Sequence, residues 1–132
     1  MFSWYFHSGV CLAYLSDIPT SGQHFAAENI SCSRWFTRGW TLQELLAPKE
    51  VLFYAADWSL IGTRSSMAHQ ISSATGIDVK YFNSKSITST AWQDQWENDQ
   101  IHPIFQASVG ERLSWLARRE TTRLEDMAYC ML

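Results

Sequence analysis

Two arginines four residues apart, Arg34 and Arg38, have a residue type and spacing that suit ligand chemistry. A guanidinium presents several N–H groups in a fixed fork, so such a pair can hold the phosphates of a nucleotide through charge-assisted hydrogen bonds. The alternative is that each arginine is solvated or paired with a carboxylate, which is the commoner state of an isolated arginine. The sequence by itself leaves both interpretations open.

A third candidate is Asp57, which together with Trp58 follows the apolar run 51–54. Ligands of α/β proteins bind beyond the carboxyl ends of parallel strands, so Asp57 would face a site if that run is such a strand. Aspartate is also typical of tight turns, because its side chain accepts hydrogen bonds from the backbone just ahead of it. Of the two interpretations, the turn is favoured.

Other kinds of chemistry are disfavoured by spacing. The four histidines share no close spacing that would suit a dyad or a metal site, and the serines lie in no G-x-S-x-G turn. The cysteines, Cys11, Cys32 and Cys130, form no C-x-x-C pair. We therefore expect no metal, no prosthetic group, and three reduced, mostly buried thiols in a cytoplasmic protein.

The composition fits one packed domain, with 46% hydrophobic and 17% charged residues over 132 positions. Seven Trp, five Tyr and seven Phe must lie in a core or at an interface. The net charge of −3 and the lack of long basic runs disfavour nucleic-acid binding. No stretch approaches the roughly 18 apolar residues that cross a membrane, and the N-terminus lacks the basic region of a secretory signal.

The elements that must position these side chains indicate an α/β fold. The apolar run 10–15 predicts a strand buried on both faces, followed by a loop to about residue 33. A helical stretch that ends at Pro48 and a second strand over 51–54 complete a β-α-β unit. Further helices are predicted over 64–75, stopped by Gly76, and over 107–118, while the long segment 83–106 is expected to be a loop.

Two T-x-x-E sequences predict helix caps. Thr41 and Glu44 would form a capping box, with Trp40 and Leu45 as its hydrophobic staple, and Thr122 would pair with Glu125 before the final helix. Helix 107–118 is expected to bury one face, formed by Val109, Leu113, Leu116 and Ala117. Arg118, Arg119 and Arg123 are expected to pair with Glu125 and Asp126.

Residues 33–48, SRWFTRGWTLQELLAP, closely resemble the central signature of the fungal heterokaryon-incompatibility (HET) domain. Blocks at 1–17, 51–63, 71–77 and 111–132 resemble the family in order and spacing, so the resemblance covers nearly the whole chain. It implies a single partial HET domain over residues 1–132, with its signature block at 33–48 and its closing block at 111–132. The family's N-terminal half is absent and 83–106 departs from the pattern, so we expect the C-terminal part of the domain, cut at both ends.

The resemblance also carries expectations about fold and chemistry. HET domains are similar in organisation to TIR domains, which implies a partial flavodoxin/TIR-like three-layer α/β fold, truncated at the N-terminus. Several TIR branches cleave NAD with a glutamate on a W-C-x-x-E-L-like helix, and residues 40–45 resemble that element with Thr41 in place of its cysteine. By carry-over, Glu44 would be the catalytic carboxylate that stabilises an oxocarbenium-like ribose. Trp40 would line the pocket, with Arg38 and Asp57 as the other substrate-binding candidates.

Three functions follow from the resemblance. The first is a signalling and assembly module that acts in fungal self/non-self recognition and cell death by binding itself or a protein partner. The second is a NAD glycohydrolase that uses Glu44, with NAD as substrate and no bound cofactor. The third is a fragment of a truncated gene without a function of its own. Whether the chain is an enzyme is left open by its residues.

Overall fold

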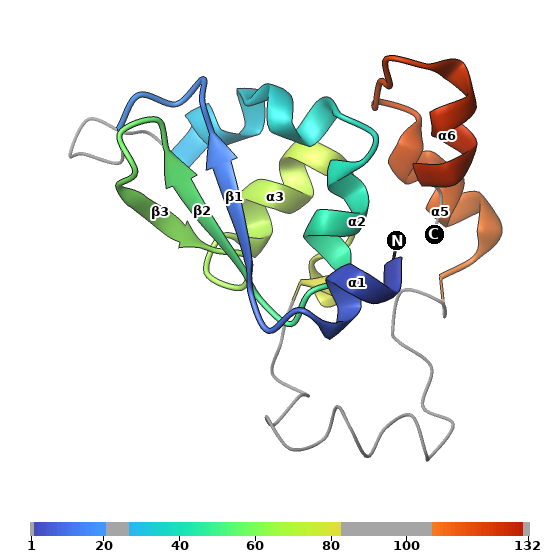
Figure 1. Cartoon of the computed structure of the whole chain (residues 1–132), viewed down its shortest axis with the longest axis horizontal. Helices are drawn as coiled ribbons and strands as arrows, with labels where there is room; N and C mark the ends of the chain where they lie inside the picture. The colour runs from blue at the N-terminus through green and yellow to red at the C-terminus, as the bar shows by residue number, and fades with distance from the viewer. Residues whose placement is uncertain (1, 21–26, 83–106, 131–132) are drawn as a thin grey trace.

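The computed structural model describes residues 2–20, 27–82 and 107–130 (Figure 1). The helices are α1 (Phe2–His7), α2 (Thr41–Leu46), α3 (Ala68–Thr75), α5 (Val109–Leu116) and α6 (Leu124–Cys130). The strands are β1 (Cys11–Leu15), β2 (Val51–Ala55) and β3 (Leu60–Thr63). Three short 3-10 segments, η1 (Ala27–Cys32), η2 (Arg34–Thr37) and η3 (Val79–Tyr81), connect them. The loop predicted over 83–106 lies outside the described residues.

The three strands form one sheet in the order β1-β2-β3. Strands β1 and β2 are parallel, with Cys11 opposite Val51 and Leu15 opposite Ala55, and α2 lies between them in the chain. The predicted β-α-β unit and the α/β class are therefore confirmed. Strand β3, which the sequence analysis did not predict, pairs antiparallel with β2 as a hairpin. The full three-layer, flavodoxin-like architecture stays a prediction.

The core lies on one face of the sheet, where α2 and α3 pack on the same side of the strands (Figure 1). Alternate strand residues enter this core, and they are fully buried together with residues of both helices, among them Leu15, Phe53, Leu45 and Ile71. Alternation follows from the period of two along a strand, which sends successive side chains to opposite faces. The helices therefore cover one set of strand side chains and not the other.

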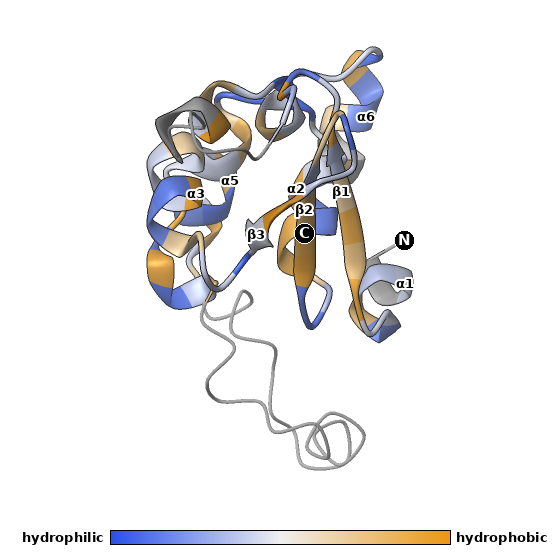
Figure 2. Cartoon of the chain, turned by 90° about the vertical axis from the view of Figure 1, so that its left-hand side faces the viewer, coloured by the Kyte–Doolittle hydropathy of each residue, from blue (hydrophilic) through white to orange (hydrophobic). Residues whose placement is uncertain are grey.

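The other face of the sheet is apolar and exposed, which makes the prediction of a doubly buried first strand wrong. Leu12 is 58% exposed and Tyr14 is 40% exposed, and in the hairpin Trp58 and Leu60 are 61% and 53% exposed. The physical reason is that β1 is an edge strand whose second face has no helix against it among the described residues. Figure 2 shows the hydrophobic ribbons of β1 and β2 beside each other.

Helix predictions succeed where the signal is local. Helix α3 begins at Ala68, later than the predicted residue 64. It ends at Thr75, and Gly76 follows in a left-handed conformation with φ of 73°, as its glycine stop predicted. Helix α5 is present, and of its predicted buried face Leu116 is buried. The prediction is wrong for Val109, Leu113 and Ala117, which are exposed, while Trp115 is buried instead. Trp115 packs edge-on against Tyr81, with ring centroids 5.2 Å apart, and this contact orients the helix.

Both predicted capping boxes are wrong. Trp40, not Thr41, occupies the N-cap of α2 and makes no side-chain cap. The Thr41 hydroxyl instead lies 2.6 Å from the carbonyl oxygen of Trp35 and 2.7 Å from that of Arg38, so it ties the helix to the preceding segment. Helix α6 begins at Leu124, too late for a Thr122 cap. An unpredicted cap exists at α5, where the Ser108 hydroxyl accepts a hydrogen bond from the Glu111 amide.

Two buried arginines donate hydrogen bonds near the two ends of α2. Arg64 donates from its guanidinium to the Leu45 and Lys49 carbonyl oxygens, each at 2.7 Å, at the carboxyl end of the helix. Arg119 donates from Nη1 to the Arg38 carbonyl at 2.8 Å and to the Thr41 hydroxyl at 2.9 Å, at its start. The predicted ion pairing of Arg119 is thus wrong, because its side chain is only 4% exposed and points into the protein.

The closing block meets the signature block through a short backbone bridge. The Gly39 amide donates to the Glu120 carbonyl at 2.9 Å, and the Glu120 amide donates to the Thr37 carbonyl at 2.6 Å. A Cβ atom on Gly39 would collide with the Thr121 methyl group and lie 3.0 Å from the Cys130 sulfur. Glycine at 39 is therefore required by the close approach of the two segments.

The cysteines differ in burial more than expected. Cys130 is buried and Cys11 is half-buried, whereas Cys32 is exposed, and all three are free thiols. The expectation of mostly buried thiols is wrong for Cys32, because η1 leaves its side chain on the surface. In the part of the chain that the structure describes, no helix has the length and hydropathy needed to cross a bilayer.

Gly39→Ala should destabilise the fold, because the new methyl group forces the closing block away from the signature block. We expect a loss of about 1–3 kcal/mol in the free energy of unfolding. Gly110→Ala is the matched control, since a Cβ there meets nothing within 4 Å and the site lies in α5. The control should gain about 0.5–1 kcal/mol from helix propensity. Urea denaturation measures both, and equal effects of the two variants would contradict the close approach.

Candidate functional site

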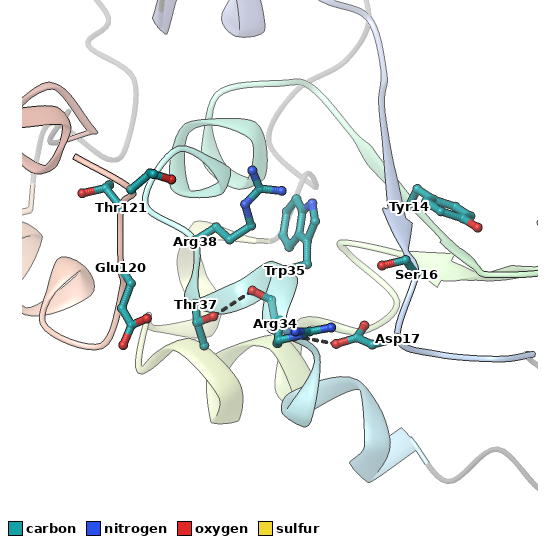
Figure 3. A pocket seen from close by; sticks show the side chains of 10 residues that line it. Tyr14, Ser16, Asp17, Arg34, Trp35, Thr37, Arg38, Glu120 and Thr121 are labelled. Carbon is teal, nitrogen blue, oxygen red and sulfur yellow. Dashed lines mark hydrogen bonds between the residues drawn. The ribbon is translucent and has the colours of Figure 1, made fainter.

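A cavity of about 530 Å³ opens at the carboxyl end of β1 (Figure 3). Three parts of the chain line it: the end of β1, the segment η2, and the start of the closing block. The lining residues are Tyr14, Ser16, Asp17, Arg34, Trp35, Thr37, Arg38, Glu120, Thr121 and Thr122. This volume suits a small-molecule site, and the end of a parallel strand is where α/β folds place ligands.

Asp17 holds the start of η2 through two hydrogen bonds. Its Oδ1 accepts a hydrogen bond from the Ser33 hydroxyl at 2.7 Å, and its Oδ2 accepts one from the Arg34 amide at 2.8 Å. Burial raises the pKa of Asp17, but these hydrogen bonds outweigh it, so the pKa falls below its usual value. The carboxylate therefore joins the end of β1 to the signature block and sets where Arg34 begins.

Trp35 forms one wall of the cavity, and core contacts hold its ring in place. Its ring packs edge-on against Phe36 and Phe53, with centroids 5.1 and 5.5 Å apart, so it is held by the core. Thr37 donates its hydroxyl to the Arg34 carbonyl at 2.8 Å, which closes the turn of η2 around this ring. Figure 3 shows Trp35 between Arg38 on one side and Ser16 and Tyr14 on the other.

The opposite wall comes from the closing block. Glu120, Thr121 and Thr122 reach the cavity because the backbone bridge at Gly39 holds that block against the signature. Arg119 sits directly before them, and its two hydrogen bonds fix the bridge from inside. The cavity thus needs residues about eighty positions apart in the chain, which no local motif could reveal.

Arg34 and Arg38 both line the cavity, and both side chains are exposed. Neither guanidinium donates a hydrogen bond to another residue in the described ranges 2–20, 27–82 and 107–130. The predicted phosphate-binding pair is therefore brought together at one cavity. Asp17 is a nearby carboxylate, but both of its oxygens already accept hydrogen bonds from Ser33 and the Arg34 backbone.

Glu44 and Trp40 do not line this cavity. Glu44 lies on the side of α2 that meets α1, where its Oε1 accepts a hydrogen bond from the Tyr5 hydroxyl at 3.3 Å. Burial raises the pKa of Glu44, while the Tyr5 hydrogen bond and the Arg38 charge oppose the rise. Trp40 is half-buried and packs against the core at the start of α2.

Asp57 lies in the hairpin turn between β2 and β3, where it is exposed. Its Oδ1 accepts hydrogen bonds from the Ser59 amide, at 2.9 Å, and from the Ser59 hydroxyl. These bonds lower the pKa of Asp57, and they confirm that it forms a turn. Of the predicted site residues, Arg34 and Arg38 line the cavity, whereas Trp40, Glu44 and Asp57 do not.

Sequence reasoning missed Asp17 and Trp35, which organise the cavity. Asp17 could have been found, because it is a carboxylate two residues after a predicted parallel strand, the same argument that singled out Asp57. Trp35 carries no such signal, since a tryptophan in an apolar run is typical of a core. Among the described residues, no three His, Cys, Asp or Glu side chains gather in a way that could hold a metal ion.

The chain is similar to the vegetative incompatibility protein HET-E-1 of Podospora anserina. The two are 34% identical over 136 residues, which cover 99% of this chain and 9% of that protein. The chain thus spans less than a tenth of the length of this relative, and it is related to a fungal heterokaryon-incompatibility protein over nearly its whole length. No family model matches the chain, and no solved structure matches it. The HET-domain boundaries and the TIR-like fold stay predictions.

Glu44→Gln should stabilise the protein near pH 7, and the gain should shrink as the pH falls. The folded pKa of Glu44 is raised, so the folded state binds more protons than the unfolded state between the two pKa values. The ionised carboxylate therefore lowers stability at neutral pH, and protonation relieves this as the pH drops through the folded pKa. Urea denaturation of both proteins from pH 7 to about pH 4 tests this. A difference in unfolding free energy between the two proteins that stays constant with pH would contradict the prediction.

Proposed function

We propose that this chain acts in fungal vegetative incompatibility as a non-catalytic signalling and assembly module that associates with a second copy of itself through β1. The kinship with a vegetative incompatibility protein supports the biological role. The observation that carries the association is the apolar, uncharged edge strand with exposed side chains. In this proposal, assembly is the event that starts cell death.

The outer edge of β1 is suited to pairing. In the described part of the chain β1 pairs only with β2, so its other edge presents backbone N–H and C=O groups without a ladder partner. Edge strands usually carry charges or proline that prevent such pairing. Residues 10–15, VCLAYL, contain neither a charged residue nor a proline.

The side chains favour a second copy as the occupant. Two β1 strands can pair antiparallel about Ala13. Leu12 of each copy then lies opposite Tyr14 of the other, which gives two such pairs. Both side chains point to the exposed face, so each pair forms an apolar cross-strand contact. Tyr14 also stacks on Trp58, with ring centroids 4.5 Å apart, which widens the apolar surface beside the joint.

A lysine on the edge should abolish the association. We expect the wild-type chain to sediment as a concentration-dependent dimer and Leu12→Lys to sediment as a monomer, because the lysine must be desolvated at the joint. Leu124→Lys is the matched control, since Leu124 is 89% exposed on α6, and it should leave the dimer intact. Analytical ultracentrifugation with circular dichroism as the folding check measures this.

The outcomes of this experiment distinguish self-association from a monomer and from a chain that does not fold. A wild-type chain that is folded and monomeric at its highest soluble concentration would overturn self-association, as would a dimer that survives Leu12→Lys. A chain that shows no cooperative unfolding would instead favour the fragment without function. When the variants are expressed in a fungal host, the proposal expects cell death from the wild type and from Leu124→Lys but not from Leu12→Lys.

A NAD glycohydrolase that uses Glu44 is the competing proposal. A half-buried carboxyl with a raised pKa is typical of catalytic acids and bases, which favours it. Glu44 lies outside the cavity and accepts a hydrogen bond from Tyr5, and this position disfavours the enzyme. We expect no release of nicotinamide when NAD is added to the folded chain, measured by chromatography. Release that stops in Glu44→Gln would replace the non-catalytic proposal with the enzyme.

A further inference from the structure

We propose that the cavity at the carboxyl end of β1 binds a small ligand that joins a phosphate group to a planar ring, as a nucleoside phosphate does. Three features carry the proposal: two arginines without hydrogen-bond partners among the described residues, a tryptophan held rigid by the core, and a volume of about 530 Å³. The proposal does not depend on self-association.

The arginines supply the phosphate site. Arg34 and Arg38 come from one short segment, η2 and its end, and both reach the same cavity. A phosphate group in the cavity can accept N–H groups from both guanidiniums through charge-assisted hydrogen bonds. The backbone from which they extend is held in place, because Asp17 accepts from the Arg34 amide and Arg119 donates to the Arg38 carbonyl.

The carboxylates of the cavity do not cancel this site. Asp17 and Glu120 also line the cavity, so its lining holds as many carboxylates as arginines. Both oxygens of Asp17 are occupied by the Ser33 hydroxyl and the Arg34 amide. Figure 3 shows the Glu120 side chain turned away from Arg38. The Asp17 charge still attracts Arg34, so a ligand phosphate competes with Asp17 for Arg34, while the Arg38 guanidinium lies beside Trp35.

Trp35 supplies the platform for a ring. Its contacts with Phe36 and Phe53 fix the indole plane, so a ligand ring that stacks on it needs no rearrangement of the wall. Every nucleobase has a π-face, and stacking on an aromatic side chain is how proteins hold bases without reading their identity. Arg38 beside the indole brings the phosphate site next to the platform (Figure 3).

Calorimetric titration with three probes tests the proposal: adenosine monophosphate, adenosine alone and inorganic phosphate alone. The nucleotide should bind more tightly than either part, because it uses both features at once. Arg34→Gln and Arg38→Gln should each weaken its binding by about tenfold or more. Arg118→Gln is the matched control, since Arg118 is exposed, lies outside the cavity and keeps the same change in net charge.

Trp35→Phe separates the two features. It should weaken binding of the nucleotide and leave binding of inorganic phosphate unchanged, with circular dichroism confirming the fold. Absence of nucleotide binding to the folded chain would overturn the proposal. So would an equal effect of Arg118→Gln, since that would mark a general charge effect. Repeating the titration on Leu12→Lys tests nucleotide binding independently of self-association. That variant is expected to be a monomer, and it keeps Arg34, Arg38 and Trp35.

Discussion

The hydrogen bonds of Arg119 hold together segments that lie far apart in the chain. Its guanidinium is buried, and burial lowers the pKa of Arg119 to about 10, so the protein keeps a cation where water is nearly absent. Nη1 reaches both the Arg38 carbonyl and the Thr41 hydroxyl, and that hydroxyl in turn contacts the Trp35 carbonyl. One side chain from the closing block thereby fixes η2, the start of α2 and one wall of the cavity.

Helix α2 shows why such long-range contacts are needed. It has only six residues, and a helix that short is not stable by itself. Arg64 satisfies carbonyl groups at its end, whereas Arg119 donates to the Arg38 carbonyl and the Thr41 hydroxyl next to its start. A cation at the carboxyl end also suits the direction of the helix dipole. Side chains from other segments therefore hold this short helix near both of its ends.

The sequence predicted those features that depend on neighbouring residues. Strands β1 and β2, the end of α3 at Gly76 and the turn at Asp57 all follow from periodicity or from one residue's backbone preference. It failed where the deciding partner lies far along the chain. Thr41 was read as a cap because its true partners, Trp35 and Arg119, are known only from the fold, and the buried face of α5 was missed because Tyr81 orients it. The same reason explains the site: Arg38 lines the cavity, whereas Glu44, on another side of α2, meets α1.

The backbone bridge between Gly39 and Glu120 has a consequence for the order in which the protein takes shape during synthesis. The residues of β1, α2 and β2 are all present once residue 55 has been made, and loop closure within this span is short. The bridge's hydrogen bond from Gly39 to Glu120 joins residues that are 81 positions apart, so it forms only after the closing block has left the ribosome. Until then the signature segment has no opposite wall. A nascent chain therefore holds an open half-site until the closing block emerges, and the cavity forms later than the pairing of β1 with β2 can.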